Sequence, residues 1–196
     1  MRCSASARHD GFPAHWRRWL RIALGLLLAA SGLARAEGIS LNSATLQLVD
    51  EGYELSADFD VRFTPAALEA LNKGVPLYFV TEFELSRHRW YWFDDAVVRM
   101  ELPYKLSYNA LTRQYRLSVG PLFQNFDSLQ EAMQVISRIN RRPVARKDAL
   151  EKGEEYTAAL RMRLDTSQLP KPFQLDAITS REWNLSSDWQ RWKVIP

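Results

Sequence analysis

The sequence predicts a mainly β fold with inserted helices, arranged as an antiparallel sheet or a two-layer β-sandwich-like single domain. Two observations lead to this prediction. Several stretches alternate apolar and polar residues with a period of two, which is typical of strands with one buried face. Most of these stretches are joined by short turn segments, which favours antiparallel pairing with helices inserted between some strands.

The clearest of these strands covers residues 75–86. Val75, Leu77, Phe79, Phe83 and Leu85 are on one face, with Thr81 among them, and the other face includes Glu82 and Glu84. At Arg87 the phase of the pattern breaks, because arginines take the positions where apolar residues are due. A shift of one residue turns every side chain to the opposite face. We therefore expect a turn or bulge at Ser86–Arg89.

The first 36 residues have the composition of a secretory signal peptide. A leader with several arginines precedes the apolar run Ile22–Ala30, and the triplet Ala34-Arg35-Ala36 before Glu37 fits a cleavage site. We expect residues 1–36 to be removed and residues 37–196 to form a single exported β-rich domain. The alternative is an uncleaved anchor, although the apolar run is shorter than the roughly 20 residues that a spanning helix needs.

Removal of the leader changes the electrostatic character of the protein. The whole chain has 26 basic and 23 acidic side chains and a net charge of +3. The first 36 residues contain six arginines and one acid, so the rest has 20 basic and 22 acidic side chains, a net charge of −2. The basic leader therefore gives no argument for a nucleic-acid partner. The only cysteine, Cys3, is in the leader, which excludes disulfides and Cys-based sites from the domain.

The first half of the domain reads as a hairpin followed by a short helix. Residues 37–63 contain two alternating stretches around the turn Asp50-Glu51-Gly52, with a change of phase near Asn42–Ser43. Thr64-Pro65 is typical of a helix start and Gly74 of a helix end. We expect a short helix between them, leading to the strand of residues 75–86.

The second half is predicted as strands around one longer helix. A strand from Trp90 to Leu102 is expected to end at Pro103, and residues 104–108 and 115–119 to pair around a turn at 109–112 and to end at Gly120-Pro121. Ser128–Asn140 is predicted as a helix, capped by Ser128 with Glu131. Residues 147–152 can form one more helical turn, and 156–165 a late strand. No periodicity is clear after Thr166.

The C-terminal segment resembles a known family. Leu164-Asp165, Leu169-Pro170-Lys171-Pro172 and Trp183-x-Leu185-x-Ser187-x-Trp189 are similar to a proteobacterial family of exported proteins, domain of unknown function four-three-nine-zero. Residues 107–115 and Trp90-Tyr91-Trp92 fit it too, so the resemblance covers nearly all of residues 37–196. It implies a periplasmic or cell-envelope protein, supplies no reaction, cofactor or catalytic residue, and hints at membrane sensor kinases as partners.

The sequence contains no catalytic motif that we can identify. No G-x-S-x-G, P-loop or G-x-G-x-x-G pattern is present. His88 with Asp94 and Asp95 could in principle bind a metal, but a solvated turn histidine is favoured. Glu82 and Glu84 could in principle act as an acid–base pair, but the polar face of a strand, paired with Arg161 or Arg163, is favoured. We expect no catalytic residue, cofactor or metal.

Two surfaces are candidates for binding. Arg87, His88, Arg89, Trp90 and Trp92 combine arginines with aromatic rings, as ligand and partner surfaces often do; alternatively, both tryptophans belong to the core and the arginines cap a hairpin. The second surface is a basic run that could meet an anionic partner or lipid headgroups, with a solvated helix end as its alternative. It comprises Arg138, Arg141, Arg142 and Arg146.

The leading hypothesis from the sequence is a non-enzymatic envelope protein that binds an envelope or membrane protein, for example as an accessory part of a membrane sensor. The alternative is a periplasmic lipid- or glycan-binding module with an apolar cleft between sheet faces. A hydrolase that uses His88 or the Glu82–Glu84 pair is the third hypothesis. The exported domain is expected not to span the membrane, and its oligomeric state is left open.

Overall fold

The chain divides into residues 1–36 and residues 37–196, and the computed structural model describes residues 38–87 and 95–196. The signal peptide and its cleavage site at Ala34, Ala36 and Glu37 lie outside the described residues and stay a prediction. No helix in the described ranges has the length and apolar character needed to cross a membrane.

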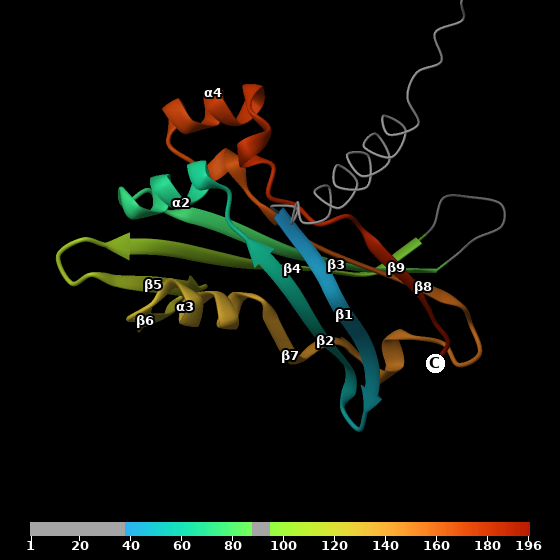
Figure 1. Ribbon diagram of the computed structural model, residues 1–196. Helices are drawn as coiled ribbons and strands as arrows, with labels where there is room; N and C mark the ends of the chain where they lie inside the picture. Colours follow the sequence, from blue (N-terminus) through green and yellow to red (C-terminus); the bar gives the residue numbers. More distant parts are fainter. Residues whose placement is uncertain (1–37, 88–94) are drawn as a thin grey trace, which may run out of the picture. The chain divides into compact units, whose positions relative to one another are not determined.

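The described residues form two antiparallel sheets with helices between strands, which confirms the mainly β fold (Figure 1). The smaller sheet has the order β1-β2-β7 and contains β1 (Gly38–Val49), β2 (Gly52–Arg62) and β7 (Arg138–Arg146). The larger sheet has the order β6-β5-β4-β3-β8-β9. Its strands are β3 (Leu77–Arg87), β4 (Asp95–Asn109), β5 (Gln114–Val119), β6 (Leu122–Phe126), β8 (Tyr156–Leu164) and β9 (Gln190–Val194).

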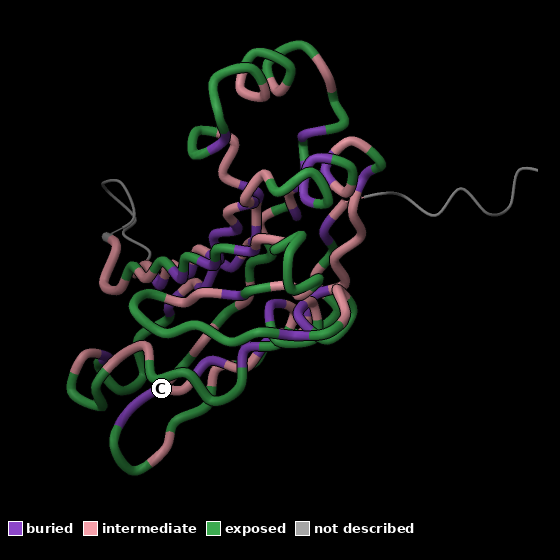
Figure 2. Tube along the Cα trace, turned by 90° about the vertical axis from the view of Figure 1, so that its left-hand side faces the viewer, coloured by how far each residue is buried: buried purple, intermediate pink, exposed green. Residues whose placement is uncertain are grey.

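Helices connect the two sheets. Helix α2 (Pro65–Asn72) leads from β2 in the small sheet to β3 in the large one, and α3 (Leu129–Ile136) leads back from β6 to β7. Helix α4 (Lys171–Thr179) and the short 3-10 turn η3 (Arg181–Trp183) belong to the C-terminal segment between β8 and β9. Helix α4 has no buried residue, whereas the strands alternate between buried and less buried positions (Figure 2).

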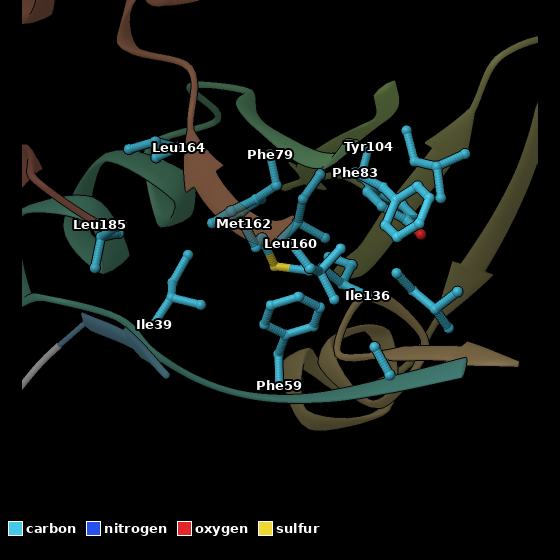
Figure 3. Close-up of a cluster of buried hydrophobic side chains, with 14 of the residues drawn as sticks. Ile39, Phe59, Phe79, Phe83, Tyr104, Ile136, Leu160, Met162, Leu164 and Leu185 are labelled. Atoms are coloured by element: carbon cyan, nitrogen blue, oxygen red, sulfur yellow. The ribbon is translucent and has the colours of Figure 1, made fainter. Parts of the chain in front are cut away.

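A single apolar core joins the two sheets. Ile39 and Phe59 of the small sheet lie opposite Phe79, Leu160 and Met162 of the large sheet (Figure 3). Ile136 of α3 and Leu185 of the C-terminal segment extend the same core. Because one face of each sheet is buried against the other, the alternating patterns of β2, β3 and β8 have a direct physical cause.

Several local predictions are confirmed by the contacts. The pairing of β1 with β2 shifts register between Leu41 and Ser43, where the sequence pattern changes phase. Thr64 Oγ1 accepts a hydrogen bond from the Ala67 N–H at 3.3 Å and caps α2. At the hairpin turn, a Cβ on Gly52 would lie 2.2 Å from the carbonyl oxygen of Ala145, so only glycine permits β7 to approach β2 there.

The predicted end of a strand at Pro103 is wrong. Strand β4 continues through Pro103 to Asn109, and Pro103 pairs with Val80 of β3. Strand β5 pairs with β4 only from Lys105 onward, so β4 has a single described neighbour at Pro103, where a missing N–H is tolerated. The register shift between Leu85 and Ser86 agrees with the expected break, but β3 runs on to Arg87, and residues 88–94 lie outside the described residues.

The second half of the predicted helix Ser128–Asn140 is also wrong. Helix α3 ends at Ile136, and the chain continues as strand β7 from Arg138. The carbonyl of Ser137 accepts a hydrogen bond from the Phe59 N–H of β2 at 2.8 Å, which places the chain against the sheet. Ile139 therefore reaches the core from a strand rather than from a helix face. The strands β6 and β9 and the helix α4 were not predicted.

Candidate functional site

The face of the large sheet that points away from the core is strongly basic. Strand alternation and cross-strand register place seven cations and three carboxylates there, and we call this surface the basic face. None of these ten residues is buried. They are Arg99, Lys105, Arg116, Arg161, Arg163, Arg191 and Lys193 together with Glu82, Glu84 and Glu101. Two further carboxylates next to β8 pair with members of this face, Asp165 with Arg163 at 3.5 Å and Glu155 with Lys193 at 2.7 Å. With these five carboxylates counted, an excess of two positive charges gathers on one face of a domain whose sequence is slightly acidic.

Glu82 is the centre of the charged network on the basic face. Its carboxylate accepts hydrogen bonds from Nε of Arg161 and, at 2.8 Å, from Nε of Arg163, and its side chain is only 13% exposed. Burial raises the pKa of Glu82, but the hydrogen bonds from both arginines outweigh it and place the pKa below its ordinary value. Glu82 is therefore ionised at neutral pH, and one carboxylate serves two guanidinium groups.

Aromatic rings lie among the cations of this face. The Arg161 guanidinium lies 4.5 Å from the centroid of the Trp189 ring, and Arg191 lies 6.0 Å from the same ring. Arg116 lies 4.7 Å from the centroid of Phe123 at the other end of the sheet. Such cation–π contacts hold long basic side chains in defined positions.

Residues 36–193 match the family described as Domain of unknown function (DUF4390). The chain belongs to this family. The match confirms the resemblance seen in the sequence and spans nearly all of the described residues. No curated protein and no solved structure is detectably similar to the chain.

The acid–base hypothesis finds no support in the DUF4390 domain. A general acid needs a raised pKa, whereas that of Glu82 is lowered by its two arginines. Glu84 is paired with Arg99 at 2.9 Å, so both glutamates belong to ion pairs of the sheet surface. Among residues 38–87 and 95–196 there is no group of three His, Cys, Asp or Glu side chains arranged to hold a metal. His88 and Asp94 lie outside the described residues.

The apolar cleft expected between the sheets is filled. Phe59, Phe79, Phe83 and Leu160 occupy this space, and none is more than 3% exposed. A lipid or glycan would therefore need another binding site on the described part of the DUF4390 domain. This result removes the geometric basis of the lipid- or glycan-binding hypothesis as it was formed from the sequence.

Only one residue of the predicted aromatic–arginine surface can be placed. Arg87 ends β3 and forms an ion pair with Glu151 at 3.0 Å. The other members, His88, Arg89, Trp90 and Trp92, lie outside the described residues. The proposal of a partner surface at this turn stays a prediction.

The predicted basic run lies on β7, at the edge of the small sheet, and not at a helix end. Three of its arginines have carboxylate partners: Arg138 with Asp58 at 3.6 Å, Arg141 with Glu54 at 2.8 Å, and Arg146 with Asp148 at 3.2 Å. Arg142 lies close enough to Tyr104 to lower its pKa, although burial raises that pKa more. The run is thus largely neutralised by the domain itself, and charges on an edge strand also oppose sheet-to-sheet aggregation.

Some residues of the basic face were predicted from the sequence, and others were not. Arg161 and Arg163 were recognised as an outer face near Glu82, and the contacts confirm this pairing. Trp189, Arg191 and Lys193 were missed because they lie in the segment without clear periodicity. The alternation of residues 190–194, with Trp192 and Val194 packed against the core and Arg191 and Lys193 exposed, was the available signal for β9.

Proposed function

We propose that this DUF4390 chain is an exported, non-enzymatic envelope protein whose basic face binds an acidic segment of another envelope or membrane protein. The observation that carries the proposal is the gathering of seven cations on one sheet face, where five carboxylates leave an excess of two positive charges. A membrane sensor kinase is the partner class that the family resemblance suggests. Export rests on the leader sequence and its cleavage site.

The chemistry of the basic face suits a charged partner. Arginine and aromatic side chains are enriched in protein interfaces, and the face combines them at Arg161–Trp189 and Arg116–Phe123. Complementary charge raises the association rate and selects the partner. An acidic segment is therefore the occupant that fits, whereas an apolar surface would desolvate Lys105, Arg116 and Arg191, which form no ion pair with a described residue, without supplying carboxylates for them.

The test is crosslinking of the tagged full-length protein in envelopes, followed by identification of the recovered protein. The double variant Lys105→Glu with Arg191→Glu reverses two exposed charges on the basic face, on β4 and β9. The matched control, Lys147→Glu with Lys152→Glu, makes the same charge change at exposed residues away from this face. We expect one envelope protein to be recovered with the wild type and the control, and to be lost with the basic-face variant.

Two results would overturn the proposal. One is recovery of the same partner by the basic-face variant and the wild type in equal amounts. The other is recovery of the wild-type protein without any partner. The mass of the recovered protein tests export independently, because cleavage predicts a chain that begins at Glu37.

A further inference from the structure

We propose that a cleft between β8 and the C-terminal segment binds a small anionic ligand through carboxylate or phosphate groups, a function beyond the docking of a protein. The cleft has a volume of about 630 Å³, which is in the range of small-molecule sites. Arg161 and Arg163 of β8 form one side of it, and Arg181 of η3 lies on the other. Of the described residues that line it, none is an aspartate or a glutamate.

The two arginines of β8 are held in place before any ligand binds. Both donate Nε to Glu82, and Arg161 also lies over the Trp189 ring. These contacts leave most of the terminal N–H groups of both guanidinium groups for other acceptors, apart from an approach of Arg163 to Asp165 at 3.5 Å. Fixed guanidinium groups lose little side-chain entropy on binding, and their planar N–H pairs match the two oxygens of a carboxylate or phosphate.

The charge of the cleft is not balanced by its neighbours. Glu82 and Asp165 are the carboxylates paired with Arg161 and Arg163. The third cation, Arg181, forms no side-chain ion pair or hydrogen bond with any described residue. One positive charge therefore remains, and it faces a cleft that an anion can enter.

Polar groups around Arg181 add donors for an oxyanion. Ser180 Oγ accepts a hydrogen bond from the Glu182 N–H at 3.2 Å, which leaves its own O–H to donate. Thr166 and Asn184 also line the cleft. The apolar part of the lining is small and includes the exposed Ile178, which suits a compact polar anion better than a lipid chain.

The experiment is calorimetric titration of the full-length protein with inorganic phosphate, pyrophosphate and citrate at constant ionic strength. We expect saturable binding of at least one probe, and the comparison of citrate with the two phosphates distinguishes a carboxylate ligand from a phosphate ligand. Arg181→Gln removes the unpaired cation and is expected to weaken binding about tenfold, as for the loss of a charge-assisted hydrogen bond. Arg113→Gln, at an exposed turn away from the cleft, should leave binding unchanged.

A second pair of variants tests the position of the site without removing an arginine. Ile178→Asp places a carboxylate on the cleft wall and should weaken anion binding about fivefold or more. Leu175→Asp is the matched control, because Leu175 is also exposed on α4 but does not line the cleft. Both sites are exposed, so neither change is expected to unfold the domain.

The proposal is wrong if no probe binds in a saturable way, or if Ile178→Asp and Leu175→Asp have equal effects. Arg181 and Ile178 are not part of the basic face. Loss of anion binding with retained partner recovery, or the reverse, would therefore separate this site from the proposed docking surface.

Discussion

The two faces of β3 have opposite environments although their residues alternate along one strand. Phe79, Phe83 and Leu85 point into the core and are at most 1% exposed, whereas Glu82 and Glu84 lie on the basic face. Apolar burial stabilises the inner face, and ion pairs between neighbouring strands organise the outer one. The comparison teaches that most of the stability of this domain comes from the inner face of β3, whereas the proposed binding of a charged partner uses the outer face, where Glu82 is the residue expected to matter for both.

The largest expected effect is on the inner face. Phe83→Ala should lower the free energy of unfolding by about 3–5 kcal/mol, because it removes a buried ring and leaves a cavity beside Trp192. Phe123→Ala removes the same side chain from the outer face, where it is 63% exposed, and should cost less than about 1 kcal/mol. Urea unfolding measures both. Equal losses would contradict the division of roles between the faces.

A smaller effect is expected within the outer face. Glu82→Gln should lower the free energy of unfolding by about 1–3 kcal/mol, because it removes the only charge that Arg161 and Arg163 share. Glu84→Gln is the control on the same strand and face. Its single partner, Arg99, has a side chain 75% exposed, so the cost should stay below about 1 kcal/mol. If the two variants lose the same free energy in urea unfolding, Glu82 is an ordinary surface residue.

The lowered pKa of Glu82 predicts how this contribution depends on pH. A glutamate in the unfolded chain titrates near pH 4.3, and folded Glu82 titrates below that. The unfolded state therefore takes up the proton first as the pH falls, which favours unfolding. We expect the stability difference between wild type and Glu82→Gln to be full above about pH 5 and to shrink below about pH 4. A difference that grows on acidification, in urea unfolding at pH 7, 5, 4 and 3, would contradict this.

Strands that bury one face could be predicted from their alternating sequence pattern. A strand without such a pattern, which forms because it pairs with a neighbouring strand, could not. Strands β2, β3 and β8 alternate because the core requires it. Strand β7 contains four arginines and a proline between its few apolar residues, and it is a strand because β2 provides its hydrogen bonds. The spacing of three residues between Ile136 and Ile139 is typical of one helix face. In the structure, Ile136 reaches the core from α3 and Ile139 reaches it from β7.

The candidate sites were predictable only in part, for a related reason. The pairing of Glu82 with Arg161 and Arg163 follows from neighbouring strands with charged outer positions. The approach of Trp189 to Arg161 depends on how residues 183–190 lie against β8, as in the bridge of Arg163 with Ser186. The cleft also needs Arg181, an exposed residue in a segment without a pattern. No signal in the sequence singled it out.

The smallest expected effect concerns Thr81, which belongs to the inner face of β3 but carries a polar group. Its side chain is fully buried, and its Oγ1 has no hydrogen-bond partner among the described residues. Thr81→Val replaces the hydroxyl with a methyl group of similar shape, so unfolding should require about 1 kcal/mol more. Thr64 is the control, because it is also buried but its Oγ1 donates a hydrogen bond to the Glu182 carbonyl at 2.7 Å and caps α2. Its replacement should therefore lower the free energy of unfolding instead of raising it. Thr64→Val should cost about 1 kcal/mol or more. A loss of stability in Thr81→Val would mean that the hydroxyl is solvated or bonded in solution, and that the inner face of β3 is less strictly apolar than its packing indicates.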